Sequence, residues 1–352
     1  MPAKTPATVV TGFLGAGKTT LIRHLLQNAE GKRIALVINE FGDLGVDGDI
    51  LKGCGIETCT EEDVMELSNG CICCTVADDF IPTMEKLLDR ETPPDHIVIE
   101  TSGLALPQPL VRAFNWPGIS TRVTVDGVVT VVDGKAVSEG RFAHSPEAID
   151  AQRAADDTLD HETPLSELFE DQLACADMIV VNKSDLLDAD EADQLATRLR
   201  SEAREGVQVI KASMGALPAS VLLGQGVGAE GDLEARHEVH HHDHDHDDHH
   251  HHDNEHTHGH DEFESFIVTR SEIDDPAAFS DQVSEVIRTH DILRLKGFAA
   301  VAGKPMRLTL QAVGPRVEHY FDQPLTGPRE TRLVVIGQAG LDQAAITEAL
   351  RA

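Results

Sequence analysis

Residues 12–19 carry a pattern that binds phosphate. The stretch fits G-x-x-x-x-G-K-[ST]. In such a loop the glycines let backbone N–H groups turn toward the β-phosphate, the Lys18 ammonium lies on the β- and γ-phosphate oxygens, and the Thr19 hydroxyl is a hard oxygen ligand for Mg²⁺. The pattern therefore predicts a nucleoside triphosphate site. Its expected binding residues are Gly12, Gly15, Ala16, Gly17, Lys18, Thr19 and Thr20.

An acidic residue and a glycine after the apolar run 96–100 are expected to complete this site. Enzymes with this phosphate loop place an acidic residue at the end of such a strand, so Glu100 is predicted to hold Mg²⁺ and to act in catalysis with Lys18. Gly103 has no side chain to keep its N–H from the γ-phosphate, so the segment after it is expected to sense hydrolysis. On the alternative interpretation, Glu100 merely ends a strand at the surface.

The identity of the base is predicted from N-K-x-D, formed by Asn182, Lys183 and Asp185 after the apolar run 178–182. The Asp185 carboxylate can accept hydrogen bonds from guanine N1–H and the 2-amino group, whereas adenine offers neither donor and would leave the charge unpaired. GTP is therefore expected over ATP. Backbone groups of residues 212–213 could close over the base.

Three thiols within four residues could bind a metal cation. Thiolates as dense as those of Cys71, Cys73 and Cys74 suit a tetrahedral cation such as Zn²⁺ or Co²⁺ and leave a coordination position for water or a recipient's ligand. A permanent structural site more often uses two separated C-x-x-C pairs, so an exchangeable metal is expected. Cys54 and Cys59 could contribute. The alternative is a set of ordinary buried or redox-active cysteines.

A second metal-binding candidate is the histidine-rich tract, residues 237–262. It holds 13 of the 19 histidines with nine Asp or Glu and no Lys or Arg. This composition cannot bury enough apolar surface to fold alone and predicts a linker. Histidines this dense also chelate Zn²⁺, Ni²⁺, Co²⁺ and Cu²⁺ in interchangeable geometries, so the tract could buffer metal. The alternative is a solvated linker whose metal affinity is incidental.

An α/β domain is expected to position these residues. Between residues 7 and 210, short β-branched runs alternate with stretches of helical period, which predicts parallel strands joined by crossover helices. The predicted fold class is a P-loop domain with a doubly wound, mostly parallel sheet. Strands are expected at residues 7–11, 33–38, 96–100, 128–132, 178–182 and 207–211, with a polar surface excursion at 135–163.

The residues after the histidine-rich tract predict a smaller α+β domain. A helix is expected to begin at Asp275-Pro276 and another to span residues 341–350. Strands are expected at 266–270, 292–301, 306–313 and 332–336. The predicted domains are therefore 1–225 with the phosphate loop and the thiol motif, 226–262 as the linker, and 263–352.

Composition and charge exclude several classes of partner. The 29 Lys and Arg against 61 Asp and Glu give a formal charge of −32, which repels phosphate backbones and anionic lipid, so neither nucleic acid nor a membrane is expected as a partner. The chain has no run of 18 apolar residues and no signal-peptide core, which predicts a cytoplasmic protein. Six cysteines with three clustered do not form a disulfide framework, and Cys175 is expected in the core.

Taken together, these motifs resemble the CobW family of metal-handling P-loop GTPases. The resemblance is carried by residues 12–19, 39–42 (N-E-F-G), 70–74 (G-C-I-C-C), 100–103 (E-T-S-G), 182–185 and 295–298 (L-K-G-F). It covers nearly the whole chain and implies GTP hydrolysis with Mg²⁺, in a family related to the urease and hydrogenase nickel GTPases. It further implies a metal at Cys71, Cys73 and Cys74 that is delivered to a client protein.

The resemblance also bears on which metal is carried. Residues 152–157, 161–164 and 169–172 are more similar to the cobalamin-pathway members than to the zinc-linked ones. Cobaltochelatase is therefore the expected client and Co²⁺ the expected metal. Members with different metals share the motifs above, and a flexible thiolate site binds Zn²⁺ more tightly than Co²⁺, so a zinc chaperone is the first alternative. A regulatory GTP switch without metal transfer and a passive metal store are further alternatives.

A mechanistic hypothesis connects the two sites. Mg²⁺ and the γ-phosphate are expected to order residues 39–49 and the segment after Gly103, which draws the thiolates together and makes metal and GTP binding mutually reinforcing. Hydrolysis would then release both. It is expected to be slow without a partner, because no catalytic Gln or arginine finger is evident. A homodimer that depends on nucleotide or metal is also expected.

Overall fold

The computed structural model describes residues 4–38, 64–66, 80–143, 145, 149, 164–233, 236, 263–314 and 316–352. The chain divides into two compact units, Met1–His258 and Gly259–Ala352. Each unit has its own sheet and its own core, and each is described by itself.

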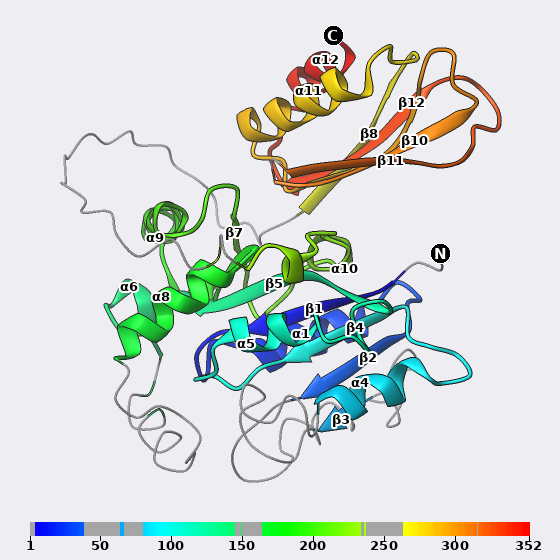
Figure 1. Ribbon diagram of the computed structural model, residues 1–352. Helices are drawn as coiled ribbons and strands as arrows, with labels where there is room; N and C mark the ends of the chain where they lie inside the picture. Colours follow the sequence, from blue (N-terminus) through cyan, green and yellow to red (C-terminus); the bar gives the residue numbers. More distant parts are fainter. Residues whose placement is uncertain are drawn as a thin grey trace. The chain divides into compact units, whose positions relative to one another are not determined.

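The first unit is built on a seven-stranded sheet in which every described strand pair is parallel (Figure 1). The strand order is β3-β2-β4-β1-β5-β6-β7. The strands are β1 (Thr5–Thr11), β2 (Ile34–Ile38), β3 (Val64–Glu66), β4 (His96–Glu100), β5 (Val123–Asp133), β6 (Met178–Asn182) and β7 (Gln208–Lys211). The order reverses on either side of β1, which confirms the predicted doubly wound α/β class.

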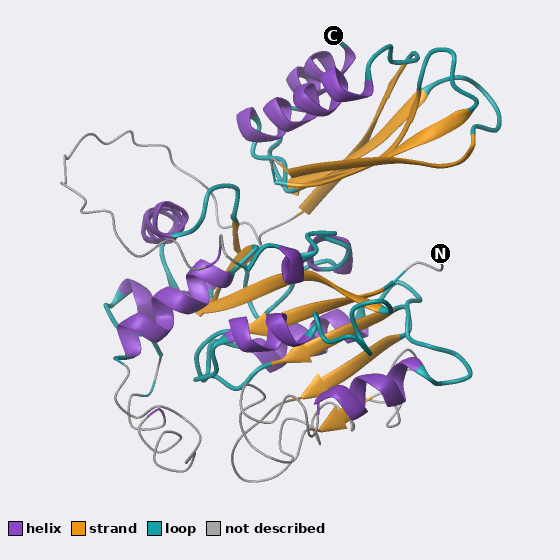
Figure 2. Ribbon diagram, in the orientation of Figure 1, coloured by secondary structure: helices purple, strands orange, loops and turns teal. Residues whose placement is uncertain are grey.

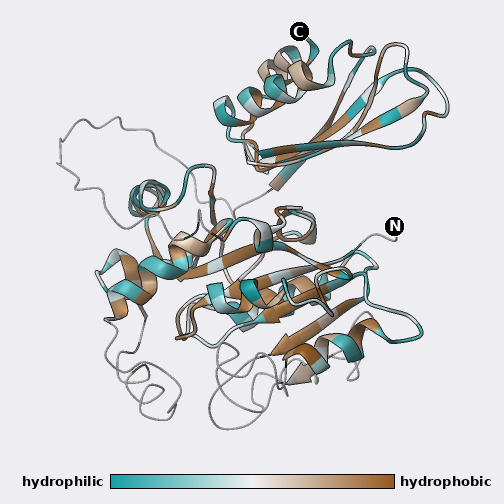
Figure 3. Cartoon of the chain, in the orientation of Figure 1, coloured by the Kyte–Doolittle hydropathy of each residue, from teal (hydrophilic) through white to brown (hydrophobic). Residues whose placement is uncertain are grey.

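Helices cover both faces of this sheet (Figure 2). Every residue of β2 and β6 is buried, and because successive side chains of a strand point to opposite faces, neither face meets water there. Figure 3 accordingly shows hydrophobic residues along the strands of the sheet. The helices are α1 (Lys18–Gln27), α4 (Ile81–Leu88), α5 (Pro107–Ala113), α6 (Gly134–Ser138), α8 (Leu165–Cys175), α9 (Ala189–Glu202) and α10 (Ala219–Leu222), with 3-10 turns η3 (Ser184–Leu186) and η4 (Ala229–Gly231).

The second unit is an antiparallel five-stranded sheet with two helices. Its strand order is β11-β10-β9-β12-β8. Phe279 and Val283 from α11 and Ile346 from α12 are buried in one hydrophobic cluster with Leu308 and Leu333 of the sheet. The elements are β8 (Phe263–Arg270), α11 (Pro276–Thr289), β9 (Arg294–Ala300), β10 (Met306–Val313), β11 (Arg316–Pro324), β12 (Thr331–Gln338) and α12 (Gln343–Arg351). Asp275 caps α11, as its position before Pro276 predicts.

Most expected strands are present, and two strands are additional. The predicted runs 96–100, 178–182 and 306–313 match β4, β6 and β10 residue for residue. β3 has only three residues, too few for a periodic signal. β11 is exposed at nearly every position, so it has no buried, alternating apolar face to reveal it in the sequence.

The predicted polar excursion at residues 135–163 is partly wrong. Its first residues belong to α6, where Ala136 and Val137 are buried. Phe142 then stacks on Phe13 of the phosphate loop with ring centroids 5.8 Å apart, and both rings contact Phe169 of α8, at 5.3 and 6.0 Å. The composition of the whole stretch is polar, and it hides one aromatic residue that packs against the back of the loop. Residues 152–157 lie outside the described part of the chain.

The chain also stays packed on the first unit beyond residue 225, where composition places the start of the linker. The Val227 N–H donates to the Asp126 carbonyl of β5 at 2.9 Å. The Glu230 carboxylate accepts hydrogen bonds from the Thr124 hydroxyl and the Val125 N–H of the same strand, at 2.7 and 2.8 Å. Residues that look solvated in the sequence therefore satisfy polar groups along β5.

Arg236 is the last described residue of the first unit, and its side chain is fully buried. The guanidinium donates to the Cys175 carbonyl and, at 2.8 Å, to the Asp177 carboxylate. The Arg236 carbonyl in turn accepts a hydrogen bond from the Gln108 side chain of α5 at 3.1 Å. Burial lowers the pKa of Arg236, but the charge and hydrogen bond of Asp177 outweigh it and hold the pKa above its usual value.

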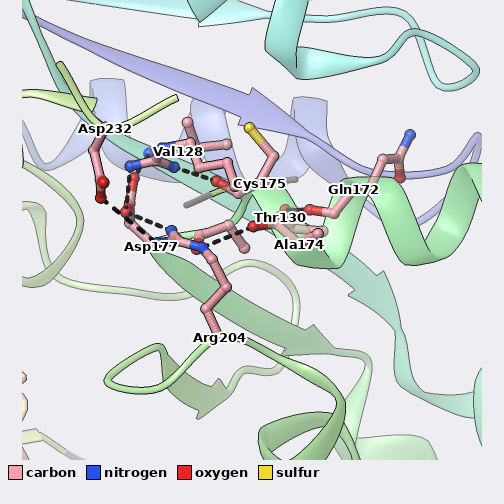
Figure 4. A network of polar contacts seen from close by, with 10 residues as sticks. Val128, Thr130, Gln172, Ala174, Cys175, Asp177, Arg204 and Asp232 are labelled. Atoms are coloured by element: carbon pink, nitrogen blue, oxygen red, sulfur yellow. Dashed lines mark hydrogen bonds and ion pairs between the residues drawn. The ribbon is translucent and has the colours of Figure 1, made fainter. Parts of the chain in front are cut away.

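Asp177 is the centre of this polar network (Figure 4). Besides Arg236 it accepts hydrogen bonds from the Arg204 guanidinium at 3.1 Å and from the Val128 N–H at 2.9 Å. Two guanidinium groups and one strand amide thus compensate a buried carboxylate. Cys175 beside it is buried and has a free thiol, as expected for a core residue, and burial raises the pKa of that thiol to about 11.

Changing Arg236 to Met should lower the free energy of unfolding of the first unit by about 2–4 kcal/mol, because Asp177 would keep Arg204 but lose a fully buried partner. Urea unfolding followed by the fluorescence of Trp116, the only tryptophan, reports on the first unit alone. The matched control is Arg198→Met, which removes a half-exposed ion pair with Glu202 and a 3.4 Å hydrogen bond to the Val137 carbonyl and should change stability by less than about 1 kcal/mol. Equal small losses in both variants would contradict the prediction.

Candidate functional site

A pocket of about 410 Å³ opens at the carboxyl ends of β1, β4 and β6. Most of the residues that the sequence predicts for nucleotide binding line it: Gly15, Gly17, Lys18, Thr19, Thr20, Glu100, Gly103, Asn182 and Lys183. Leu14, Thr101 and Ser102, which belong to the motifs at 12–19 and 100–103, also line it, and Met214 lines it from outside any motif. Three motifs far apart in the sequence therefore meet at one edge of the sheet.

The phosphate loop presents an open helix N-terminus to this pocket. Gly17 is the N-cap of α1, and no side chain of the described residues caps the helix there. Gly17 has φ +100°, which favours glycine, and a Cβ at this position would lie 2.2 Å from Asn182 Nδ2. The first N–H groups of α1 can thus receive an anion, which the helix dipole favours.

Lys18 is almost fully buried beneath the loop. Its ammonium donates to the Gly12 carbonyl at 2.7 Å and to the Phe13 carbonyl at 3.3 Å. Gly12 is therefore a partner of Lys18 and is not among the residues that line the pocket. A cation held at this position can exchange a carbonyl for a phosphate oxygen without leaving the loop.

Thr19 and Glu100 converge across the pocket. The Thr19 hydroxyl donates to Glu100 Oε1 at 3.0 Å. Glu100 is buried, so the alternative interpretation of it as a surface residue is wrong. A hydroxyl and a carboxylate at this separation form a hard oxygen donor set, which fits Mg²⁺ and does not fit a thiophilic cation.

Gly103 lies directly against the phosphate loop. A Cβ at this position would be 2.7 Å from the Leu14 nitrogen, so only glycine allows the two backbones to approach this closely. The Gly103 carbonyl points the other way and accepts a hydrogen bond from the Gln172 side chain of α8 at 3.2 Å. Contacts with the phosphate loop and with α8 thus fix the segment that follows Glu100.

Asn182 connects the phosphate loop to the loop after β7. Its side chain donates to the Ala16 carbonyl at 2.9 Å and accepts from the Gly215 N–H at 3.0 Å. Ala16 is thus held through its carbonyl and, like Gly12, does not line the pocket. Met214, in the loop after β7, is two-thirds exposed and lines the pocket.

Lys183 and Asp185 complete the base-recognition motif. Lys183 has φ +60° and pairs with Asp133 at the end of β5, with its nitrogen 2.6 Å from the buried carboxylate. Asp185 is exposed and does not line the pocket, although it lies two residues beyond Lys183 in the same turn. Sequence reasoning missed Asp133, for which an acidic residue after the apolar run 128–132 is the available signal.

Two of the motifs singled out in the sequence, and the histidine-rich tract, lie outside the described residues. They are Cys71, Cys73 and Cys74 with Cys54 and Cys59, residues 39–42, and residues 237–262. Within the ranges that the structure describes, no group of three His, Cys, Asp or Glu side chains is arranged to hold a metal ion. The thiol site therefore remains a prediction from the sequence.

Both units match models of known protein families. Residues 6–211 match the family model for the CobW/HypB/UreG nucleotide-binding domain, and residues 263–352 match that of the cobalamin synthesis protein cobW C-terminal domain. The chain is 60% identical to a zinc chaperone CobW from Sinorhizobium sp, over 99% of this chain and 97% of that protein. It is 54% identical to a zinc chaperone CobW from Pseudomonas aeruginosa, over 99% and 91%.

Among solved structures, the zinc-bound GTPase YjiA from E. coli aligns with 99% of this chain and 100% of its own. The alignment has 23% sequence identity and a TM-score of 0.43.

The N-K-x-D motif predicts that Asp185→Asn will exchange guanine for xanthine recognition. GTP affinity should fall about 100-fold, because the amide cannot accept from both guanine donors, while affinity for xanthosine triphosphate should rise, because its C2 carbonyl can accept from the amide. Competition against a fluorescent GDP measures both affinities. Asp190→Asn, an exposed carboxylate in the first turn of α9, is the charge-matched control and should change neither by more than about 2-fold. An unchanged preference in Asp185→Asn would count against base recognition by this motif.

Proposed function

The chain belongs to the CobW/HypB/UreG family of P-loop GTPases, and from this premise we propose that it is a metallochaperone whose cargo is Zn²⁺. The observation that carries the proposal is the 60% identity over nearly the full length to a zinc chaperone. Zn²⁺ here takes the place of the Co²⁺ expected in the sequence analysis, which rested on a short insertion. Thiolate chemistry agrees, because Zn²⁺ lies above Co²⁺ in affinity at a flexible sulfur site.

Hydrolysis of GTP takes place at the pocket between the phosphate loop and Gly103. We assign Lys18 to the β- and γ-phosphate oxygens, the α1 N-terminus to the phosphate anion, and Gly103 to sensing of the γ-phosphate. Thr19 and Glu100 would hold Mg²⁺, which neutralises charge on the transferring phosphoryl group. Asn182 fixes the phosphate loop through the Ala16 carbonyl, while Lys183 and Asp185 select guanine.

The cargo site is proposed at Cys71, Cys73 and Cys74. Three thiolates with an open fourth position hold Zn²⁺ and can pass it to a recipient's ligand. In this mechanism the γ-phosphate orders the segments that flank the thiol motif, so the triphosphate state binds zinc more tightly than the diphosphate state. If GTP strengthens zinc binding about 100-fold, a coupling of about 2.7 kcal/mol, then zinc must strengthen GTP binding by the same factor.

The proposed partner is a protein that receives the metal, and a homodimer is proposed to form with nucleotide or metal. We propose the reduced cytoplasm as the compartment, since the mechanism needs GTP and free thiols. Among the described residues, no helix has the length and apolarity needed to cross a bilayer.

Delivery of Co²⁺ to a cobaltochelatase is the second candidate. The specific observation in its favour is that residues 263–352 match the C-terminal domain model named for cobalamin synthesis. The two candidates share the GTPase chemistry and differ in the metal and the client. They are separated by measuring the affinity of the GTP-bound and the GDP-bound protein for each metal: the cargo is the metal whose affinity differs more between the two states.

The proposal predicts nucleotide-dependent zinc binding at the thiols. Zn²⁺ competition against a chromophoric chelator is measured with Mg²⁺ and a non-hydrolysable GTP analogue, then with Mg²⁺-GDP, in a protein whose histidines between residues 237 and 260 are changed to Gln to remove background chelation. Affinity should be about 100-fold higher with the analogue. Changing Cys71, Cys73 and Cys74 together to Ser should abolish this tight site.

Lys18→Ala is the matched control for coupling. It should keep zinc binding at the thiols but lose the difference between the two nucleotides, because the triphosphate is no longer held. Equal zinc affinity in the two nucleotide states of the Cys-containing protein would refute the metallochaperone mechanism while leaving GTP hydrolysis intact.

A further inference from the structure

Gln172 of α8 is fully buried and is aimed at the segment that follows Glu100. Its side-chain Nε2 donates to the Gly103 carbonyl at 3.2 Å and to the Ala105 carbonyl at 3.4 Å. One side-chain amide thus donates to two carbonyls, two residues apart, in the turn that leads from Glu100, the predicted magnesium ligand, into α5. The residue is labelled in the close view of Figure 4.

The other half of the same amide is unsatisfied. Gln172 Oε1 is buried and has no hydrogen-bond partner among the described residues. A buried, unpaired amide oxygen is unfavourable, and an apolar residue of similar volume would avoid that penalty. The two hydrogen bonds to the turn are therefore the contacts that offset the unpaired oxygen.

The helix that carries Gln172 is fixed to the phosphate loop. Phe169, one turn earlier, packs on Phe13 of the loop with ring centroids 6.0 Å apart. The Gln172 carbonyl accepts from the Thr130 hydroxyl of β5 at 2.9 Å. The amide therefore holds the turn in a constant place relative to the phosphate loop.

These two hydrogen bonds determine which edge of the turn faces the nucleotide pocket. Because the carbonyls of Gly103 and Ala105 are held toward α8, the opposite edge of the turn is left facing the phosphate loop, where Gly103 touches Leu14 and lines the pocket. In the proposed nucleotide site this edge would face the γ-phosphate, which a diphosphate lacks. By holding the turn in this orientation, the Gln172 amide can affect binding of the triphosphate and the diphosphate differently without contacting either nucleotide.

We propose that Gln172 is a positioning residue of the GTPase: by holding the carbonyls of Gly103 and Ala105 on α8, it keeps the turn ready for the γ-phosphate and so sets the preference for triphosphate over diphosphate. The inference rests on the proposed nucleotide site and deepens it. It requires no metal cargo, so its failure and that of the metallochaperone mechanism are distinguishable.

The test measures the affinities of a non-hydrolysable GTP analogue and of GDP for Gln172→Met, together with the turnover of GTP. The substitution keeps the volume and removes the donor. The ratio of analogue to GDP affinity should fall about 10-fold and turnover should slow by a similar factor, while GDP affinity stays within about 2-fold of wild type. Equal losses for both nucleotides would indicate a merely structural role and overturn the proposal, as would no change in either.

Gln225 supplies the matched control. It is also a buried glutamine whose Nε2 donates to a backbone carbonyl, that of Leu222, and whose Oε1 has no partner among the described residues, and it does not line the nucleotide pocket. Gln225→Met should leave the ratio of the two affinities unchanged whatever it does to the unfolding temperature. A fall in the ratio equal to that of Gln172→Met would overturn the proposal.

Gln172→Glu tests the donor itself and covers the case in which Gln172→Met does not fold. Burial raises the pKa of the introduced carboxyl, so as the pH falls it becomes protonated and regains one O–H that can donate to a backbone carbonyl. The affinity ratio, taken relative to wild type at each pH, should be low at pH 8 and recover toward wild type at pH 6. A ratio that stays flat with pH would overturn the proposal.

Discussion

Parallel pairing of β1 with its neighbours is the constraint on which the nucleotide site depends. Because all the paired strands of the sheet run the same way, their carboxyl ends lie at a single edge. The phosphate loop follows β1, Glu100 ends β4 and Asn182 ends β6, so three separate segments converge there. The order of the sheet changes direction about β1, which is where an open α/β sheet leaves room for a ligand.

The functional residues that can be predicted from the sequence are those whose type and position within a local motif are enough to indicate their role. Lys18 lies in a phosphate loop and Glu100 ends an apolar strand, and both signals are local. Gln172 and Arg236 act through partners far along the chain, Gly103 for the first and Asp177 for the second. Gln172 lies in an amphipathic helix and Arg236 precedes a charged tract, so neither neighbourhood distinguishes it. Tertiary contacts of this kind have no signature in a single sequence.

The two metal sites proposed for the chain differ in the hardness of their ligands. Thr19 and Glu100 offer oxygen at the nucleotide pocket, whereas Cys71, Cys73 and Cys74 offer sulfur in a separate stretch of sequence. Mg²⁺ prefers the first set and Zn²⁺ the second. A GTPase with both sets can therefore use one metal for phosphate chemistry while it carries another. The similarity to zinc chaperones outweighs the local similarity of residues 152–157, 161–164 and 169–172, because it extends over 99% of the chain.

The contact between Gly103 and the Leu14 nitrogen is made of backbone on both sides. If the turn shifts with the nucleotide, it therefore acts on the loop through main-chain atoms, with no side chain between them. Glycine has no side chain to shorten, so every substitution at position 103 adds atoms that force the turn away from the loop. Substitution at position 103 can therefore only separate the turn from the loop, and a graded change in their spacing has to come from residues that hold the turn from the other side.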